Sequence, residues 1–140
     1  MNAGILLMTH TGIASSMLDI AQTIWQQLPD NIDIIEVPFD SDSEIITRNV
    51  KQKITELDTG DGVLILSDLP GATPCNLASS LNLQTVKIVS GLNLPMLIRT
   101  SYYNSSCDLD ALAQVAIEGG QRAITLVDQA TCQIDKETST

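Results

Sequence analysis

Short apolar runs alternate with helical patterns along this chain, and this alternation limits the folds open to it more than any other feature. The runs are too short for buried helices and lie at 3–8, 32–38, 62–66, 86–89 and 123–127. Between them, apolar residues recur at the three-to-four spacing of surface helices. Because strands that alternate with helices form a parallel sheet covered on both sides, we predict an open α/β sandwich with a mostly parallel sheet. Residues 1–128 form one domain in this prediction, followed by a loose polar tail at 129–140.

The helices are predicted from their apolar stripes and end signals at 13–28, 41–57 and 74–81, from about 95, and at 109–118. Ser41 and Glu44 have the spacing of a capping box, which indicates where the second helix begins. Thr73 followed by Pro74 is typical of an N-cap and a first helical residue.

Two of the predicted strands differ in their polarity, and a third raises a question of assembly. The run 62–66 is apolar throughout and is predicted to be central, whereas 32–38 alternates with acidic residues and is predicted near an edge. The run 123–127 follows Gly119 and Gly120, which are predicted to form a flexible hinge. We expect this last strand to be exchanged in a homodimer; the alternative is a monomer in which it returns to its own sheet.

The net charge of the chain limits the classes of partner that it is expected to bind. Seventeen acidic residues against seven basic ones give a net charge of −10, which disfavours nucleic acid and anionic lipid and favours a basic protein partner. Three cysteines without a CxxC pair argue against a disulfide framework, and one histidine with scattered acids argues against a metal site. No apolar run approaches the ~20 residues of a membrane span, so we expect a cytoplasmic protein with no direct membrane insertion.

The single histidine, His10, is the first candidate for chemistry. It lies in Thr9-His10-Thr11-Gly12, between the first predicted strand and the first predicted helix. Backbone N–H groups at a helix start favour an anion, and imidazole is a nucleophile near neutral pH. This arrangement therefore predicts a histidine that handles phosphate.

The loop after the third predicted strand supplies a partner for His10. If the first and third strands are neighbours, their loops share one crevice at the carboxyl ends of the strands. Asp68 would then accept a hydrogen bond from one ring nitrogen and leave the other nitrogen free to attack phosphorus. The residues predicted to contact the phosphoryl oxygens are two glycines, through their backbone, and three hydroxyl residues: Gly12, Gly71, Thr9, Ser67 and Thr73.

Each of these residues also has a simpler interpretation. A lone histidine in a loop is often only solvated, and Asp68 alone is compatible with a turn residue or a helix cap. Cys75 is interpreted as a buried helix residue rather than as a second nucleophile.

Three segments at matching separations resemble the IIA proteins of the mannose-type sugar phosphotransferase system: THTG (9–12), DLPGATPCN (68–76) and GLNLPMLIR (91–99). The resemblance covers about residues 2–128. It implies phosphorylation of His10 with Asp68 as its orienting partner, phosphate received from HPr and passed to a IIB protein, no cofactor, and a dimer with an exchanged strand. The chain departs from the family at Thr11, where glycine is common, and at Pro70 and Cys75, where many members carry an aromatic residue.

Two other functions remain open from the sequence. One is a regulatory module whose phosphorylation state is sensed by a partner protein. The other is the phosphoryl-donor subunit of dihydroxyacetone kinase, whose first domain is similar. Genes for IIB, IIC and IID proteins beside this one would favour transport over regulation.

Overall fold

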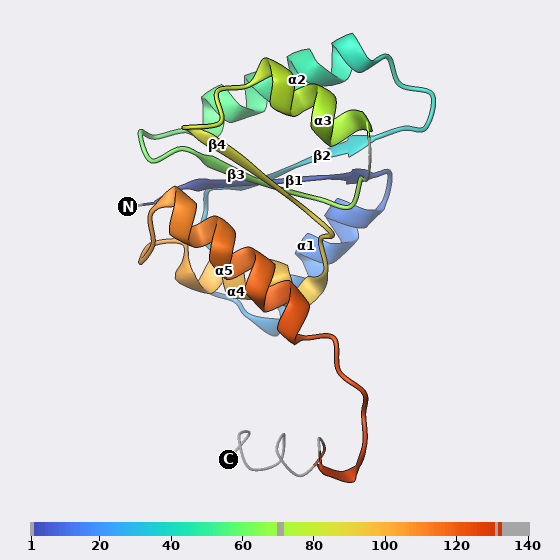
Figure 1. The fold of residues 1–140 in the computed structure, drawn as a ribbon, viewed down its shortest axis with the longest axis vertical. Coiled ribbons are helices and arrows are strands. Elements are labelled where there is room, and N and C mark those ends of the chain that lie inside the picture. The colour runs from blue at the N-terminus through green and yellow to red at the C-terminus, as the bar shows by residue number, and fades with distance from the viewer. Residues whose placement is uncertain (1, 70–71, 131, 133–140) are drawn as a thin grey trace.

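The four strands of the sheet are all parallel and stand in the order β2-β1-β3-β4 (Figure 1). The computed structural model describes residues 2–69, 72–130 and 132. Along the chain the elements are β1 (Gly4–His10), α1 (Ile13–Ile24), β2 (Ile32–Val37), α2 (Ser43–Leu57), β3 (Val63–Ser67), α3 (Ala72–Ser80), β4 (Val86–Ser90), α4 (Leu94–Tyr103) and α5 (Leu109–Arg122). The predicted open parallel sheet is confirmed, with the apolar β3 inside it and the more polar β2 at an edge.

The sheet is buried on both faces, which explains why β1 is apolar at successive positions. Ile5 and Leu7 face a core shared with α1, α4 and α5, whereas Leu6 and Met8 face a second core that includes Val50 of α2 and Leu77 of α3. Figure 1 shows α2 and α3 on one side of the sheet and the other three helices on the opposite side. All four β1 side chains are fully buried, and each such burial stabilises the fold by roughly 1.5–3 kcal/mol.

The order of the strands creates a switch point between β1 and β3. From β1 the chain passes to β2 on one side, and then to β3 and β4 on the other. Met8 pairs with Ser67, so the carboxyl ends of β1 and β3 lie next to each other. This is the crevice in which open α/β sheets bind ligands.

The predicted end of α1 and the predicted cap of α2 were both wrong. Helix α1 ends at Ile24 rather than at Leu28, because Trp25 is already extended, with φ −136° and ψ 102°. Leu28 still packs against the core, which is why its spacing imitated a further helical turn. Asp42, not Ser41, caps α2: its carboxylate accepts the N–H of Glu44 at 2.9 Å, and the Ser41 hydroxyl donates to the carbonyl of Pro38.

Helix α3 begins at Ala72, so Thr73 is its second residue and not its N-cap. Pro74 then follows as the third residue. A proline is tolerated there because the first four N–H groups of a helix have no partner within the helix.

The glycine pair that we interpreted as a hinge lies inside α5, which extends to Arg122 instead of ending at 118. Both glycines are buried against α4. A Cβ at Gly119 would lie 2.8 Å from Cδ of Arg99, and one at Gly120 would lie 2.7 Å from Cε of Met96. The glycines therefore permit the close approach of two helices.

The predicted fifth strand, 123–127, is not a strand in the single chain. Residues 124–128 have no regular secondary structure, and Figure 1 shows this segment leading away from the sheet. Its apolar side chains are exposed: Ile124 by 80%, Leu126 by 86% and Val127 by 73%. High strand propensity does not make a strand where no neighbouring strand is within reach.

Candidate functional site

His10 and Asp68 meet at the switch point through two contacts. His10 is the last residue of β1, and Asp68 directly follows β3. Nδ1 of His10 lies 3.0 Å from Oδ2 of Asp68, and Oδ1 accepts the backbone N–H of His10, also at 3.0 Å. The side chains are 34% and 17% exposed, so the pair lies at the surface with the carboxylate more enclosed than the ring.

This geometry determines which ring nitrogen is available. A carboxylate only accepts hydrogen bonds, so Nδ1 carries the proton that it shares with Asp68. Nε2 is then the unprotonated nitrogen, with a lone pair for attack or ligation. The second contact, to the backbone, anchors the Asp68 carboxylate on the same residue whose ring it orients.

Two of the hydroxyls predicted to contact phosphate are used inside the protein. Thr9 is fully buried; its hydroxyl donates to the carbonyl of His10 at 2.8 Å and accepts the N–H of Ala14 at 2.9 Å. Ser67 is also fully buried, and its hydroxyl accepts the N–H of Leu69 at 3.0 Å. The Thr9 hydroxyl has already donated its only proton, and burial keeps Ser67 from a ligand at the surface.

Gly12 turns the chain from β1 into α1. Its φ of +92° lies in the left-handed region, and it occupies the N-cap position of α1 without a side chain to cap the helix. A Cβ at Gly12 would meet no atom within 4 Å, so open space adjoins its backbone. Gly71 lies outside the described residues, and the Thr73 side chain is likewise not described.

Glu36, in β2, was not predicted to belong to the site. It pairs in register with Thr9, and its Oε2 accepts both the N–H and the hydroxyl of Ser15, at 3.0 and 2.9 Å. The backbone N–H and hydroxyl of Ser15, with a further contribution from the Gly12 backbone, hold the pKa of Glu36 below its usual value. The start of α1, which we expected to be free for phosphate, therefore already faces a carboxylate.

Phe39 is a second residue near His10 that was not predicted. It follows β2 by two residues, and its ring centroid lies 5.1 Å from that of His10, at an interplanar angle of 36°. The signal was a large apolar residue in an otherwise polar loop at the same edge of the sheet.

The other candidates do not join this site. Cys75 is exposed on α3, contrary to the interpretation as a buried residue, because the helix directs Leu77 to the core and Cys75 to the surface. Within residues 2–69, 72–130 and 132, no three His, Cys, Asp or Glu side chains gather as metal ligands would. In the same part of the chain, no helix combines the length and apolar character needed to cross a membrane.

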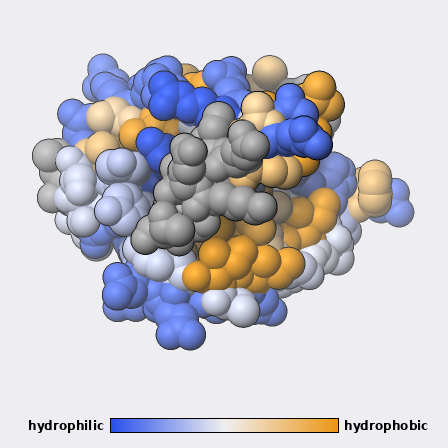
Figure 2. Space-filling view, turned by 90° about the horizontal axis from the view of Figure 1, so that it is seen from below, coloured by the Kyte–Doolittle hydropathy of each residue, from blue (hydrophilic) through white to orange (hydrophobic). Residues whose placement is uncertain are grey.

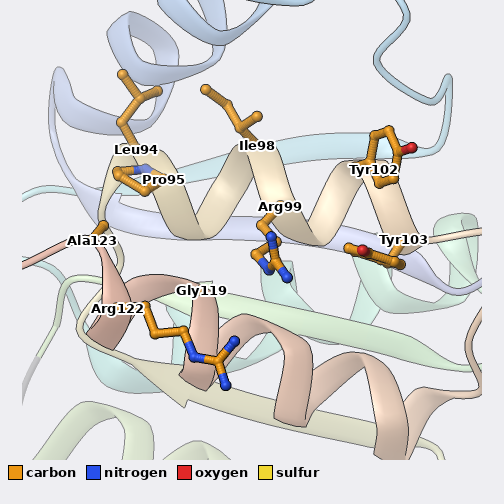
Figure 3. A pocket seen from close by; sticks show the side chains of 9 residues that line it. All are labelled: Leu94, Pro95, Ile98, Arg99, Tyr102, Tyr103, Gly119, Arg122 and Ala123. Atoms are coloured by element: carbon orange, nitrogen blue, oxygen red, sulfur yellow. The ribbon is translucent and has the colours of Figure 1, made fainter. Parts of the chain in front are cut away.

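A pocket of about 780 Å³ lies elsewhere, between α4 and α5. Figure 3 shows Arg99 extending from α4 and Arg122 from α5, with Tyr102 and Tyr103 nearby on α4. None of the residues that line it belongs to the His10–Asp68 site. The His10 ring is 34% exposed at the surface, which is compatible with a reaction between two proteins.

The fold and the site together define a class of protein: an open parallel α/β sheet with a histidine–aspartate pair at its switch point. Comparison with known proteins makes the class specific. The sequence model of the PTS system fructose IIA component matches residues 4–117, and the chain belongs to this family, the mannose-type IIA components of the sugar phosphotransferase system.

Solved structures agree with this family. The mannose/sorbose-specific IIA subunit from Enterococcus faecalis is 29% identical, with a TM-score of 0.77, over 91% of this chain and 96% of its own. The PTS IIA protein associated with the fucose utilization operon of Streptococcus pneumoniae is also 29% identical, with a TM-score of 0.75, over 93% and 96%.

A curated relative is longer than this chain. The mannose-specific EIIAB component of Escherichia coli K12 is 27% identical over 127 residues, which cover 89% of this chain and 39% of the relative. The chain thus spans about two fifths of the curated relatives it matches. What the family model shows for this chain is membership among the IIA components of the sugar phosphotransferase system.

Proposed function

We propose that this protein is a phosphocarrier that receives a phosphoryl group on Nε2 of His10 from phospho-HPr and passes it to a IIB component for sugar uptake. The observation that carries the proposal is the 3.0 Å contact between Nδ1 of His10 and Oδ2 of Asp68. It leaves Nε2 as the nucleophile of a ring that is 34% exposed. Family membership supports the same role.

The transfer step balances without a cofactor. The lone pair of Nε2 attacks phosphorus, the bond between phosphorus and the donor histidine nitrogen breaks, and the donor imidazole keeps that electron pair. The His10 ring becomes positively charged while its Nδ1 proton stays hydrogen-bonded to Asp68. The negative carboxylate offsets this charge at the moment it forms, which is the role of the aspartate in a catalytic triad. Transfer to the IIB component is the reverse step with a different partner.

We propose fewer residues in contact with the phosphoryl oxygens than the sequence predicts. We retain Gly12, with open space beside its backbone, and Thr73, the second residue of α3. Gly71, which lies outside the described residues, stays a prediction. We do not propose Thr9 and Ser67 as phosphate contacts, because both hydroxyls are buried and each already takes part in a hydrogen bond. Their part in the site is to shape the ends of β1 and β3.

The function is tested by incubating the protein with labelled phosphoenolpyruvate, enzyme I and HPr. One phosphate per chain is expected, labile in acid and stable in base, as for a phosphohistidine. His10→Ala is expected to fold normally and take up none. Label retained by that variant, or a wild-type protein that remains unlabelled, contradicts the proposal. Transfer onward to a IIB protein tests its second half.

We also propose that the protein is a homodimer in which residues 123–127 pair with the partner copy. Figure 2 views the face formed by α1, α4 and α5, and apolar side chains gather there. Ile20 and Ile24 of α1 are half-exposed, and Ile124 and Val127 are mostly exposed. A second copy covering these side chains would remove them from water.

The mass in solution tests the dimer. Light scattering is expected to give about 30 kDa, twice the 15.0 kDa of one chain. A mass of one chain at micromolar concentration contradicts the dimer. Removal of residues 121–140 is expected to abolish it; a truncated chain that still dimerises places the contact on another face.

A further inference from the structure

Phe39 is the most exposed large apolar side chain in the part of the chain that the structure describes, at 90%. It lies directly beside His10, with 5.1 Å between the ring centroids. An exposed aromatic ring carries a large apolar area in water and is a common anchor of protein interfaces. Because the Phe39 ring lies next to His10, a protein that approaches the nucleophile would meet this exposed ring.

The turn that carries Phe39 is held from within. Pro38 restricts the backbone just before it, and Ser41 closes the turn with two hydrogen bonds to the Pro38 carbonyl, from its N–H at 3.3 Å and its hydroxyl at 2.8 Å. Asp42 then caps α2. The Phe39 ring is therefore carried by a turn that hydrogen bonds and the cap of α2 hold in place.

We propose that Phe39 is the contact through which the donor protein, which bears a phosphohistidine, docks over His10; this inference rests on the proposed function. For in-line transfer the phosphorus must come within about 3–3.5 Å of Nε2. A protein surface that reaches this distance must also cover a ring whose centre is 5.1 Å from that of His10. Phe39 is thus buried in the transfer complex, and the buried apolar area stabilises that complex.

The effect of Phe39 belongs to binding of the donor protein and not to the chemistry of the imidazole. Full burial of a phenylalanine side chain corresponds to about 10–100-fold in affinity. Phe39→Ala is therefore expected to raise the KM for the phosphorylated donor protein by this factor, with the single-turnover rate at saturation unchanged. Phe39→Leu, which keeps most of the apolar area, is expected to recover most of the loss.

Two controls separate docking from chemistry. Leu83→Ala removes an apolar side chain, 44% exposed, that precedes β4 and so lies at the opposite edge of the sheet; it is expected to leave the KM unchanged. Phosphoramidate, a small phosphoryl donor that presents no protein surface, is expected to label wild-type and Phe39→Ala proteins at equal rates.

The outcomes distinguish this inference from the function on which it rests. Wild-type transfer with an unchanged KM in Phe39→Ala overturns the inference and leaves the phosphocarrier proposal intact. A fall in the saturated rate, or slower labelling by phosphoramidate, also overturns it, because Phe39 would then act on the ring. A faster variant would show that Phe39 obstructs the donor. A wild-type protein that takes no phosphate from either donor overturns both proposals.

Discussion

Two carboxylates lie near the end of β1, Glu36 in β2 and Asp68 directly after β3, and they make different contacts. Asp68, after β3, contacts the imidazole and the backbone of His10. Glu36, in β2, contacts Ser15 at the start of α1. The two groups share their chemistry and their edge of the sheet. Their roles differ because one meets a titratable ring and the other meets the N–H groups of a helix, so the partner decides what a carboxylate contributes.

The largest difference between them is expected in phosphoryl transfer. In Asp68→Asn, the amide oxygen can still accept the backbone N–H of His10, which turns the NH₂ group toward Nδ1. Nδ1 must then accept, the proton moves to Nε2, and the nucleophile is lost. We expect transfer from phospho-HPr to slow by about 10–100-fold or more, measured in single turnovers at saturating donor.

Glu36→Gln is the matched variant for this measurement. It changes the other carboxylate by the same substitution, and its transfer rate is expected to stay near that of the wild-type protein. Equal slowing in both variants would mean that the site responds to total negative charge. An unaltered rate in Asp68→Asn would show that the pairing with His10 has no role in transfer.

The Thr9 hydroxyl is a second group that binds the start of α1, beside Glu36. The variant Thr9→Val measures its contribution separately from that of Glu36. The substitution keeps the shape of the side chain but removes the hydroxyl that bonds Ala14 and the His10 carbonyl. We expect a loss of about 1–2 kcal/mol in the free energy of unfolding, measured with urea. Thr23→Val, at an exposed position of the same helix, is the control and is expected to change stability by less than about 0.5 kcal/mol.

The comparison also shows how far the sequence predicts such a site. Asp68 was predictable because it follows an apolar strand, and parallel strands bring their carboxyl ends to one edge. Glu36 was not, because an acidic residue in an alternating strand usually marks a solvated face. Its contact with Ser15 depends on β2 being the neighbour of β1, and on the exact start of α1. Phe39 was not predicted for the same reason. Its loop follows β2, and the position of β2 beside β1 is not evident from the sequence.

The fold shows the same limit in two apolar runs of five residues. The run 62–66 corresponds to β3 (Val63–Ser67), a buried strand between two others, whereas 123–127 is exposed and irregular in the single chain. Local composition predicted a strand for both. What differs is the availability of neighbours, which composition does not encode. The buried glycines of α5 were misjudged similarly, because the helix that packs against them lies about 20 residues away in sequence.

The smallest expected effect is the contribution of Glu36 to stability, which can be recognised by its dependence on pH. The pKa of Glu36 is lowered in the folded protein, chiefly by the N–H of Ser15 and then by its hydroxyl. A lowered carboxyl pKa adds stability above the unfolded pKa, here 4.5, and this stability is lost as the pH falls through the folded value.

Glu36→Gln is therefore expected to be slightly less stable than the wild-type protein at pH 7, with a difference that shrinks steadily below pH 4.5. Urea unfolding across this range measures it, with Glu118→Gln, the same substitution at an exposed position of α5, measured alongside for comparison. A difference that stays constant down to pH 3 would mean that the substitution acts through its shape or its hydrogen bonds, and that the charge of Glu36 does not stabilise the start of α1.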